Sequence, residues 1–162
     1  MKPLISIGIP VKNGFENKTE KDIDLEKALY SILSQSYNNM EIIISNNCST
    51  DKTKAFLEDI SKTDKRIKVF DQTKEISGGE NFQFVLEQSK GKYFRWNAAD
   101  DFMSPNYIEE NFNFLEKNPD YVASSSKFFF ENDKKNYYSH NLNEGLYDRI
   151  KHFFNIRYLS HN

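Results

Sequence analysis

Two adjacent aspartates, Asp100 and Asp101, follow a strand-like run at residues 92–96. Neighbouring carboxylates at the end of a buried strand are costly unless a cation neutralises them. A divalent metal that carries a diphosphate suits such a pair, because Mg²⁺ binds through one or two carboxylates together with phosphate oxygens and water. The pair also suits an ordinary helix start, in which Asp101 or Ser104 caps a helix that Pro105 opens. The residues alone leave both interpretations open.

Three more polar segments follow predicted strands. They are residues 10–13, residues 45–51 and the loop around Gly78 and Gly79. Parallel sheets bind ligands beyond the carboxyl ends of their strands. We therefore expect these segments to meet residues 97–101 at one edge of a sheet, which is the arrangement that a nucleotide pocket needs.

Strand and helix patterns alternate along the chain, which is typical of an α/β fold with a mostly parallel central sheet flanked by helices. Pro10 is expected to end the first strand, Ser49 or Thr50 to cap the second helix, and residues 76–79 to form a loop. The expected strands are residues 4–10, 41–45, 67–70, 92–96, 121–125 and 127–131. A first helix is expected to begin near residue 24, and further helices are expected at residues 51–62, 81–89, 105–117 and 147–158.

Composition narrows the class of protein. The 162 residues, 38% of them hydrophobic and 28% charged, suit one soluble globular domain. A net charge of −2 gives no reason to expect a nucleic-acid partner. The single cysteine, Cys48, fits a reducing compartment. No apolar run approaches the roughly 20 residues of a membrane-spanning helix. We expect a cytoplasmic location and leave peripheral association with the inner face of the membrane open.

Five motifs, in this order and at these spacings, resemble the family 2 glycosyltransferases. The motifs are residues 6–13 (SIGIPVKN), 31–37 (SILSQSY), 41–51 (EIIISNNCSTD), 78–82 (GGENF) and 99–101 (ADD). The resemblance extends from residue 4 to about residue 121. It implies the GT-A fold, an inverting reaction and the donor-binding N-terminal portion of such an enzyme. We expect residues 1–162 to form a single GT-A domain that is truncated on its C-terminal, acceptor side.

The resemblance also implies a site for a nucleotide-sugar donor. The glycine pair would let the backbone approach that ligand without a Cβ clash. Asn81 could instead cap the next helix, and Asp51 suits the first turn of its helix better than a ligand contact. The residues assigned to the donor by resemblance are Pro10, Lys12, Asn13, Asn46, Asn47, Gly78, Gly79, Asn81 and Asp100.

Two positions depart from the family pattern. An acidic residue is usual where Asn46 stands, and Ala98 replaces the first aspartate of the Asp-x-Asp motif. An asparagine can still accept and donate hydrogen bonds, so a base contact is retained. By resemblance Asp100 ligates Mg²⁺ or Mn²⁺, while Asp101 ligates the metal, orients the loop or caps a helix. The metal would neutralise the nucleoside diphosphate leaving group.

An inverting transfer also needs a base that deprotonates the acceptor hydroxyl. By resemblance this base is an Asp or Glu well after the metal motif, near or beyond the C-terminal end, and its identity stays open. The candidates in this chain, none of them in a recognisable motif, are Glu131, Asp133, Glu144 and Asp148. We expect a transferase of the hexosyltransferase type that acts on a saccharide or lipid-linked acceptor in surface polysaccharide or glycolipid synthesis. The alternative is a degenerate, non-catalytic domain that binds a nucleotide sugar or a partner.

Overall fold

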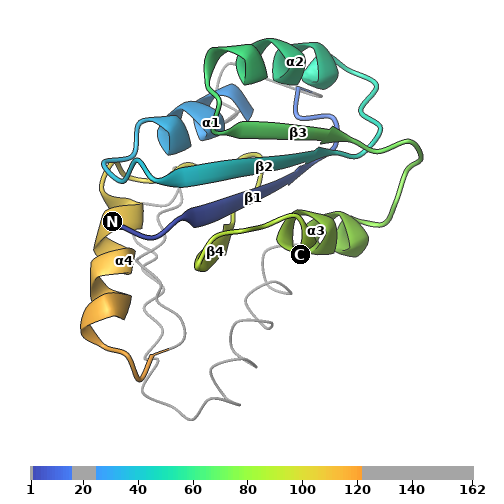
Figure 1. Ribbon diagram of the computed structural model, residues 1–162. Helices are drawn as coiled ribbons and strands as arrows, with labels where there is room; N and C mark the ends of the chain where they lie inside the picture. Colours follow the sequence, from blue (N-terminus) through green and yellow to red (C-terminus); the bar gives the residue numbers. More distant parts are fainter. Residues whose placement is uncertain (1, 16–24, 122–162) are drawn as a thin grey trace, which may run out of the picture. The chain divides into compact units, whose positions relative to one another are not determined.

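The computed structural model describes residues 2–15 and 25–121, which form a parallel sheet with helices on both faces (Figure 1). The strand order is β3-β2-β1-β4, and each neighbouring pair is parallel. The predicted α/β class with a mostly parallel sheet is confirmed. In chain order the elements are β1 (Ile5–Val11), α1 (Leu25–Leu33), β2 (Met40–Asn46), α2 (Thr53–Thr63), β3 (Ile67–Asp71), α3 (Gly78–Glu87), β4 (Tyr93–Trp96) and α4 (Tyr107–Lys117).

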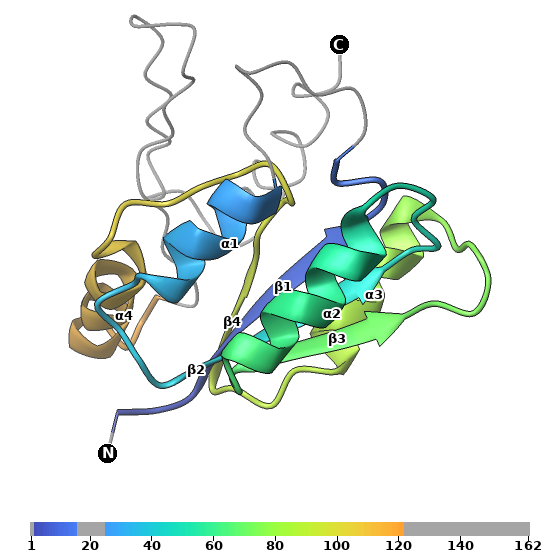
Figure 2. The same ribbon diagram turned by 90° about the horizontal axis from the view of Figure 1, so that it is seen from above.

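The two faces of the sheet are covered by different helices. Figures 1 and 2 show α1 and α2 over one face and α3 beneath the other. The close approach of α3 depends on Gly8, because a Cβ atom there would lie 2.6 Å from the Phe94 ring and 2.8 Å from Val85. The buried core joins β1 and β2 to α1 and α2 through Ile5, Ile7, Ile9, Leu25, Leu29, Ile32, Ile42, Ile44, Leu57 and Ile60.

Pro10 does not end β1, contrary to the prediction. The strand continues to Val11, and Pro10 pairs with Ser45 of β2. Successive residues of β1 direct their backbone N–H and C=O groups alternately toward β2 and toward β4. Gly8 directs its groups toward β4, and its carbonyl accepts from the Asn97 N–H. Pro10 faces the same side, beyond the last β4 pair at Gly8 and Trp96. Its missing N–H therefore removes no ladder hydrogen bond.

The predicted start of α3 is also wrong. The helix begins at Gly78 because Ser77 and Glu80 form a capping box. The Ser77 hydroxyl accepts from the Glu80 N–H at 3.2 Å, and the Glu80 carboxylate accepts from the Ser77 N–H at 2.7 Å. Gly78 and Gly79 thus occupy the first helical turn instead of a loop. Asn81 lies inside the helix and is not its cap.

The caps expected for α2 and α4 are absent as well. The N-cap residues are Lys52 and Asn106, and neither makes a side-chain capping hydrogen bond. Asp51 serves the first turn of α2 instead, since its carboxylate accepts from the Thr53 N–H at 2.9 Å. The strands expected beyond Tyr121 and the helix expected at residues 147–158 lie outside the described residues. No helix in the described part of the chain is long and apolar enough to cross a membrane.

A buried carboxylate connects the strands at the amino end of the sheet, the edge at which the strands begin. Glu41 is 4% exposed. It accepts from the Ser6 hydroxyl at 2.6 Å, the Lys90 N–H at 2.6 Å and the Lys68 ammonium at 2.7 Å. Desolvation raises the pKa of the Glu41 carboxyl, but the hydrogen bonds from Lys68, Ser6 and Lys90 together lower it below its ordinary value. The ionised form therefore stabilises the fold.

We expect Glu41→Gln to lower the free energy of unfolding by about 1–3 kcal/mol at neutral pH, because an amide cannot satisfy three donors as a carboxylate does. The folded-state pKa is lowered, so this contribution is present above the unfolded-state pKa of about 4.3 and is lost as the pH falls through the folded value. Urea unfolding of both proteins at neutral and acidic pH measures it. Glu26→Gln, at an exposed position of α1, is the control. A difference that stays constant on acidification would contradict this assignment.

Candidate functional site

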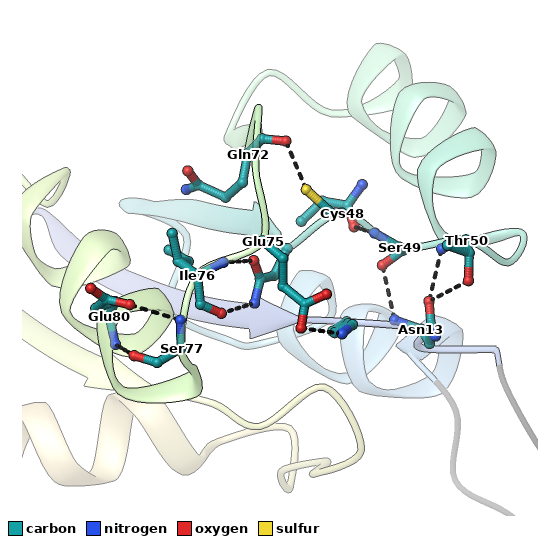
Figure 3. A network of polar contacts seen from close by, with 12 residues as sticks. Asn13, Cys48, Ser49, Thr50, Gln72, Glu75, Ile76, Ser77 and Glu80 are labelled. Atoms are coloured by element: carbon teal, nitrogen blue, oxygen red, sulfur yellow. Dashed lines mark hydrogen bonds and ion pairs between the residues drawn. The ribbon is translucent and has the colours of Figure 1, made fainter.

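The loops that follow β1 and β2 are tied together by Asn13. Its N–H donates to the Ser49 hydroxyl at 2.9 Å, and its side-chain oxygen accepts from the Thr50 N–H at 2.8 Å (Figure 3). Asn13 has a φ of 51°, a left-handed conformation that asparagine adopts more readily than most residues. The neighbouring Phe15 N–H donates to the Asp51 carboxylate at 2.7 Å. The two loops are therefore held as one unit.

Asn47 ties the β2 loop to the segment that leads into α3. Its side-chain amide donates to the Ile76 carbonyl at 2.7 Å and accepts from the Ile76 N–H at 2.9 Å. These two hydrogen bonds take the place of those that a neighbouring strand would make with the Ile76 backbone. The Cys48 thiol donates to the Gln72 carbonyl at 3.2 Å (Figure 3). Lys12, just after β1, forms an ion pair with Glu75 at 2.5 Å. The ends of β1, β2 and β3 thus form a connected polar surface.

Asn46 and Asn81 lie at the base of this surface. Asn46 is 2% exposed, donates to the Asp71 carboxylate at 2.7 Å and accepts from the Ser49 N–H at 3.3 Å. Asn81 donates to the Ser45 carbonyl at 3.3 Å, while its buried side-chain oxygen has no hydrogen-bond partner. Neighbouring Gly78 and Gly79 leave open space, because a Cβ atom at either would meet nothing within 4 Å.

The acidic loop after β4 is shaped by Asn97. This side chain is 1% exposed, and its amide donates to the carbonyls of Ala98 and Asp101, both at 2.8 Å. Its backbone N–H donates to Gly8 of β1 at 2.9 Å. The sequence placed Asn97 in the polar segment at the end of β4 but indicated no role for its side chain. Its contacts hold the aspartate pair next to the end of the central strand.

Asp100 and Asp101 are both exposed at this edge. Desolvation and repulsion from Asp100 raise the pKa of the Asp101 carboxyl, and Arg95 offsets part of that rise. A cation would relieve this repulsion. In residues 2–15 and 25–121 no group of three or more His, Cys, Asp or Glu side chains could hold a metal ion. Two carboxylates are few protein ligands for a metal ion, and Mg²⁺ in proteins is usually bound through one or two carboxylates together with phosphate oxygens and water.

The structure brings most of the predicted donor residues to one edge of the sheet. Pro10 is buried in β1, whereas Lys12 is exposed just beyond its end. The candidate bases Glu131, Asp133, Glu144 and Asp148 lie outside the described residues. Sequence reasoning also missed Asp71 and Glu75, whose partners are far along the chain.

The profile described as Glycosyl transferase family 2 matches residues 6–162. The chain belongs to this family. It is 38% identical over 124 residues to an uncharacterized glycosyltransferase of Haemophilus influenzae, covering 76% of this chain and 36% of the relative. A glycosyltransferase of Rickettsia typhi, also uncharacterized, is 39% identical over 116 residues, covering 71% and 33%. The chain thus spans about a third of the length of these relatives.

Solved structures support the GT-A fold predicted from the sequence. S. aureus TarS 1-349 in complex with UDP-GlcNAc matches with a TM-score of 0.60 at 22% identity, covering 70% of this chain and 31% of that one. A mannosyltransferase of Pyrobaculum calidifontis in complex with GDP-Man and Mn²⁺ matches with a TM-score of 0.52 at 19% identity, covering 63% and 29%. The family and the fold are therefore both confirmed.

We expect Asn47→Asp to loosen the segment before α3, because a carboxylate repels the Ile76 carbonyl that the amide now donates to. Removing this buried donor should lower the free energy of unfolding by about 1–3 kcal/mol. Amide hydrogen exchange should show faster exchange at Ile76. Asn38→Asp, at an exposed position before β2, is the matched control. Unchanged protection of Ile76 would show that the amide does not hold this segment.

Proposed function

We propose that this chain forms the donor-binding part of a glycosyltransferase that moves a sugar from a nucleotide sugar to an acceptor hydroxyl with inversion at the anomeric carbon. The observation that carries the proposal is the convergence of the loops after β1, β2 and β4 and the segment before α3 at one sheet edge. Membership of the family supports the same conclusion.

The chain's own residues would bind and orient the donor. Pro10, Lys12 and Asn13 would border the nucleoside, and Asn46 and Asn47 would contact or position the base and ribose. The open space over Gly78 and Gly79 would admit the ligand close to the first turn of α3, beside Asn81. Because Asn13 and Asn47 are already engaged with neighbouring loops, their contribution is largely to fix the shape of the pocket before the donor arrives.

Asp100 would hold Mg²⁺ or Mn²⁺, and Asp101 would share in that task. When bound, the metal would stabilise the negative charge that develops on the nucleoside diphosphate. Asn97 would keep both carboxylates in place through its hydrogen bonds to the loop carbonyls. The transfer would also need a carboxylate that deprotonates the acceptor hydroxyl, for which this chain offers the candidates Glu131, Asp133, Glu144 and Asp148.

The wider biological role is proposed from family membership. We propose a hexosyltransferase that uses a saccharide or lipid-linked acceptor in surface polysaccharide or glycolipid synthesis, in the cytoplasm and at the inner face of the membrane. Transfer by the full-length protein from a labelled nucleotide sugar to lipid-linked saccharides, analysed for anomeric configuration, tests the reaction and its stereochemistry.

A second candidate function is a non-catalytic domain that binds a nucleotide sugar or a partner. It is favoured by Ala98, which stands where the family commonly has an aspartate, and by Asn46, whose amide is engaged by Asp71 and Ser49. Donor hydrolysis or transfer by the full-length protein would reject it. Metal-dependent nucleotide binding with neither activity would support it.

Isothermal titration of this chain with UDP, GDP, CDP and dTDP, each with and without Mn²⁺, tests the donor site directly. We expect one nucleotide to bind, and only with metal. Asp100→Ala should weaken that binding at least about tenfold, with unchanged far-UV circular dichroism, because an exposed aspartate contributes to metal binding and little to folding. Asp120→Ala, at an exposed position after α4, is the control. Undiminished binding by Asp100→Ala would remove the metal assignment.

Metal binding should weaken on acidification, because metal ligands must be deprotonated and the pKa of Asp101 is raised. Its carboxyl takes up a proton at a higher pH than an ordinary aspartate does. The affinity for Mn²⁺ should be measured in the presence of saturating nucleotide from about pH 4 to pH 8. As the pH is lowered, this affinity should begin to fall at a pH above the ordinary aspartate pKa of about 3.9. In Asp101→Asn the affinity should be lower throughout and decline at a lower pH. An identical pH profile in this variant would exclude Asp101 as a ligand.

A further inference from the structure

The ends of β2 and β3 carry a hydrogen-bonded pair of unlike residues. Asn46 and Asp71 are register partners, and the Asn46 amide donates to the Asp71 carboxylate at 2.7 Å. Asn46 is 2% exposed, whereas the Asp71 side chain is 39% exposed. The buried member is neutral, and the charged member reaches solvent at the edge that holds the proposed donor site.

The Asp71 carboxylate is rigidly placed. The N–H of the next residue, Gln72, donates to the Asn46 carbonyl at 3.0 Å, and the Gln72 side chain donates to the Ser45 hydroxyl at 2.9 Å. The orientation of the Asn46 amide is set as well, because its oxygen accepts from the Ser49 N–H at 3.3 Å. A carboxylate anchored in this way needs little further ordering to accept a hydrogen bond from a ligand.

Acceptor capacity remains on this carboxylate. Its Oδ1 accepts from Asn46, and Lys54 lies 3.4 Å from its Oδ2. That separation is long for a hydrogen bond, and the Lys54 side chain is 57% exposed, so the ion pair is weak and easily displaced. Each carboxylate oxygen has two lone pairs. Oδ2 can therefore accept from a donor that enters at the sheet edge.

We propose that Asp71 determines the base specificity of the donor site by accepting the ring N–H of uracil, thymine or guanine. The inference rests on the proposed function. A carboxylate is acceptor-only when ionised, so it is matched by a ring nitrogen that carries hydrogen. In cytosine and adenine the corresponding ring nitrogen carries a lone pair, which the carboxylate repels. A charge-assisted hydrogen bond also gives more discrimination than a neutral one.

Titration calorimetry with UDP, GDP, dTDP, CDP and ADP in the presence of Mn²⁺ tests the proposal. The wild-type chain should bind one of the first three more tightly than CDP and ADP. Asp71→Asn should weaken that binding about tenfold or more, because the lost contact is a hydrogen bond to a charged acceptor. The difference in affinity between the preferred nucleotide and CDP should therefore become smaller. Asp59→Asn, at an exposed position of α2, makes the same chemical change away from the edge and should bind as the wild type does.

The double variant N46D/D71N separates base recognition from structure. Asp at position 46 would still accept from the Ser49 N–H and from the new amide at position 71, so the pair keeps its hydrogen bond with reversed polarity. The charge, however, moves from the exposed position to the buried one. We expect this variant to keep the circular dichroism of the wild type but to unfold at a lower temperature, because the charge is now buried, and to bind the preferred nucleotide as weakly as Asp71→Asn.

A base-free ligand completes the test. Inorganic pyrophosphate with Mn²⁺ should bind the wild type and Asp71→Asn equally, because it carries no base. The proposal is overturned by tightest binding of CDP or ADP, by unchanged nucleotide binding in Asp71→Asn, or by equal losses for nucleotide and pyrophosphate. Wild-type protein that binds no nucleotide at all would overturn the proposed function along with it, whereas the three preceding results leave the donor site intact.

Discussion

The structure depends on the parallel arrangement of its strands, which brings every carboxyl end to the same edge of the sheet. Beyond that edge the backbone groups lose their ladder partners and must find others. Asparagine side chains take this role after three strands: Asn13 after β1, Asn47 after β2 and Asn97 after β4. An amide both donates and accepts, so one side chain can satisfy two loop groups. These asparagines and the Asp51 carboxylate together order the loops, and the exposed carboxylate of Asp71 at the same edge retains capacity for a ligand.

The opposite edge shows a different solution to the same problem. There Glu41 is buried and ionised, and it satisfies donors from β1, β3 and the turn before β4. The turn approaches so closely that a Cβ atom at Gly91 would lie 2.6 Å from the Ser6 hydroxyl. A buried charge that is fully hydrogen-bonded is costly to disturb, so it fixes strand register at this end. The amino edge thus holds a buried, ionised carboxylate, whereas Asp71, Asp100 and Asp101 at the carboxyl edge are exposed.

The sequence predicted the strands well because β1, β2 and β3 are short runs that contain Ile or Val and β4 is a short aromatic run, and all four begin and end within one residue of expectation. The predicted element boundaries were wrong where two local sequence signals disagreed. The glycine pair suggested a loop, but the capping box of Ser77 and Glu80 starts a helix there. Pro10 suggested a strand end, but its missing N–H faces the side where β4 has already stopped. The role of Asp71 depends on Asn46, its partner in a neighbouring strand, which no local pattern records.

The charges at the carboxyl edge explain why a diphosphate would need a metal there. Lys12 is paired with Glu75 at 2.5 Å, and Lys54 lies between Asp71 and Glu58. Both lysines therefore already compensate neighbouring acids, while Asp100 and Asp101 add further negative charge. A diphosphate entering this edge without a cation would be repelled by the aspartate pair. In the proposed function the same pair would attract a divalent ion, which would reverse the local sign and make the edge favourable for phosphate. The acidic loop would then link metal binding to donor binding, and Asn97, which shapes that loop, would be a positioning residue that need not touch the ligand.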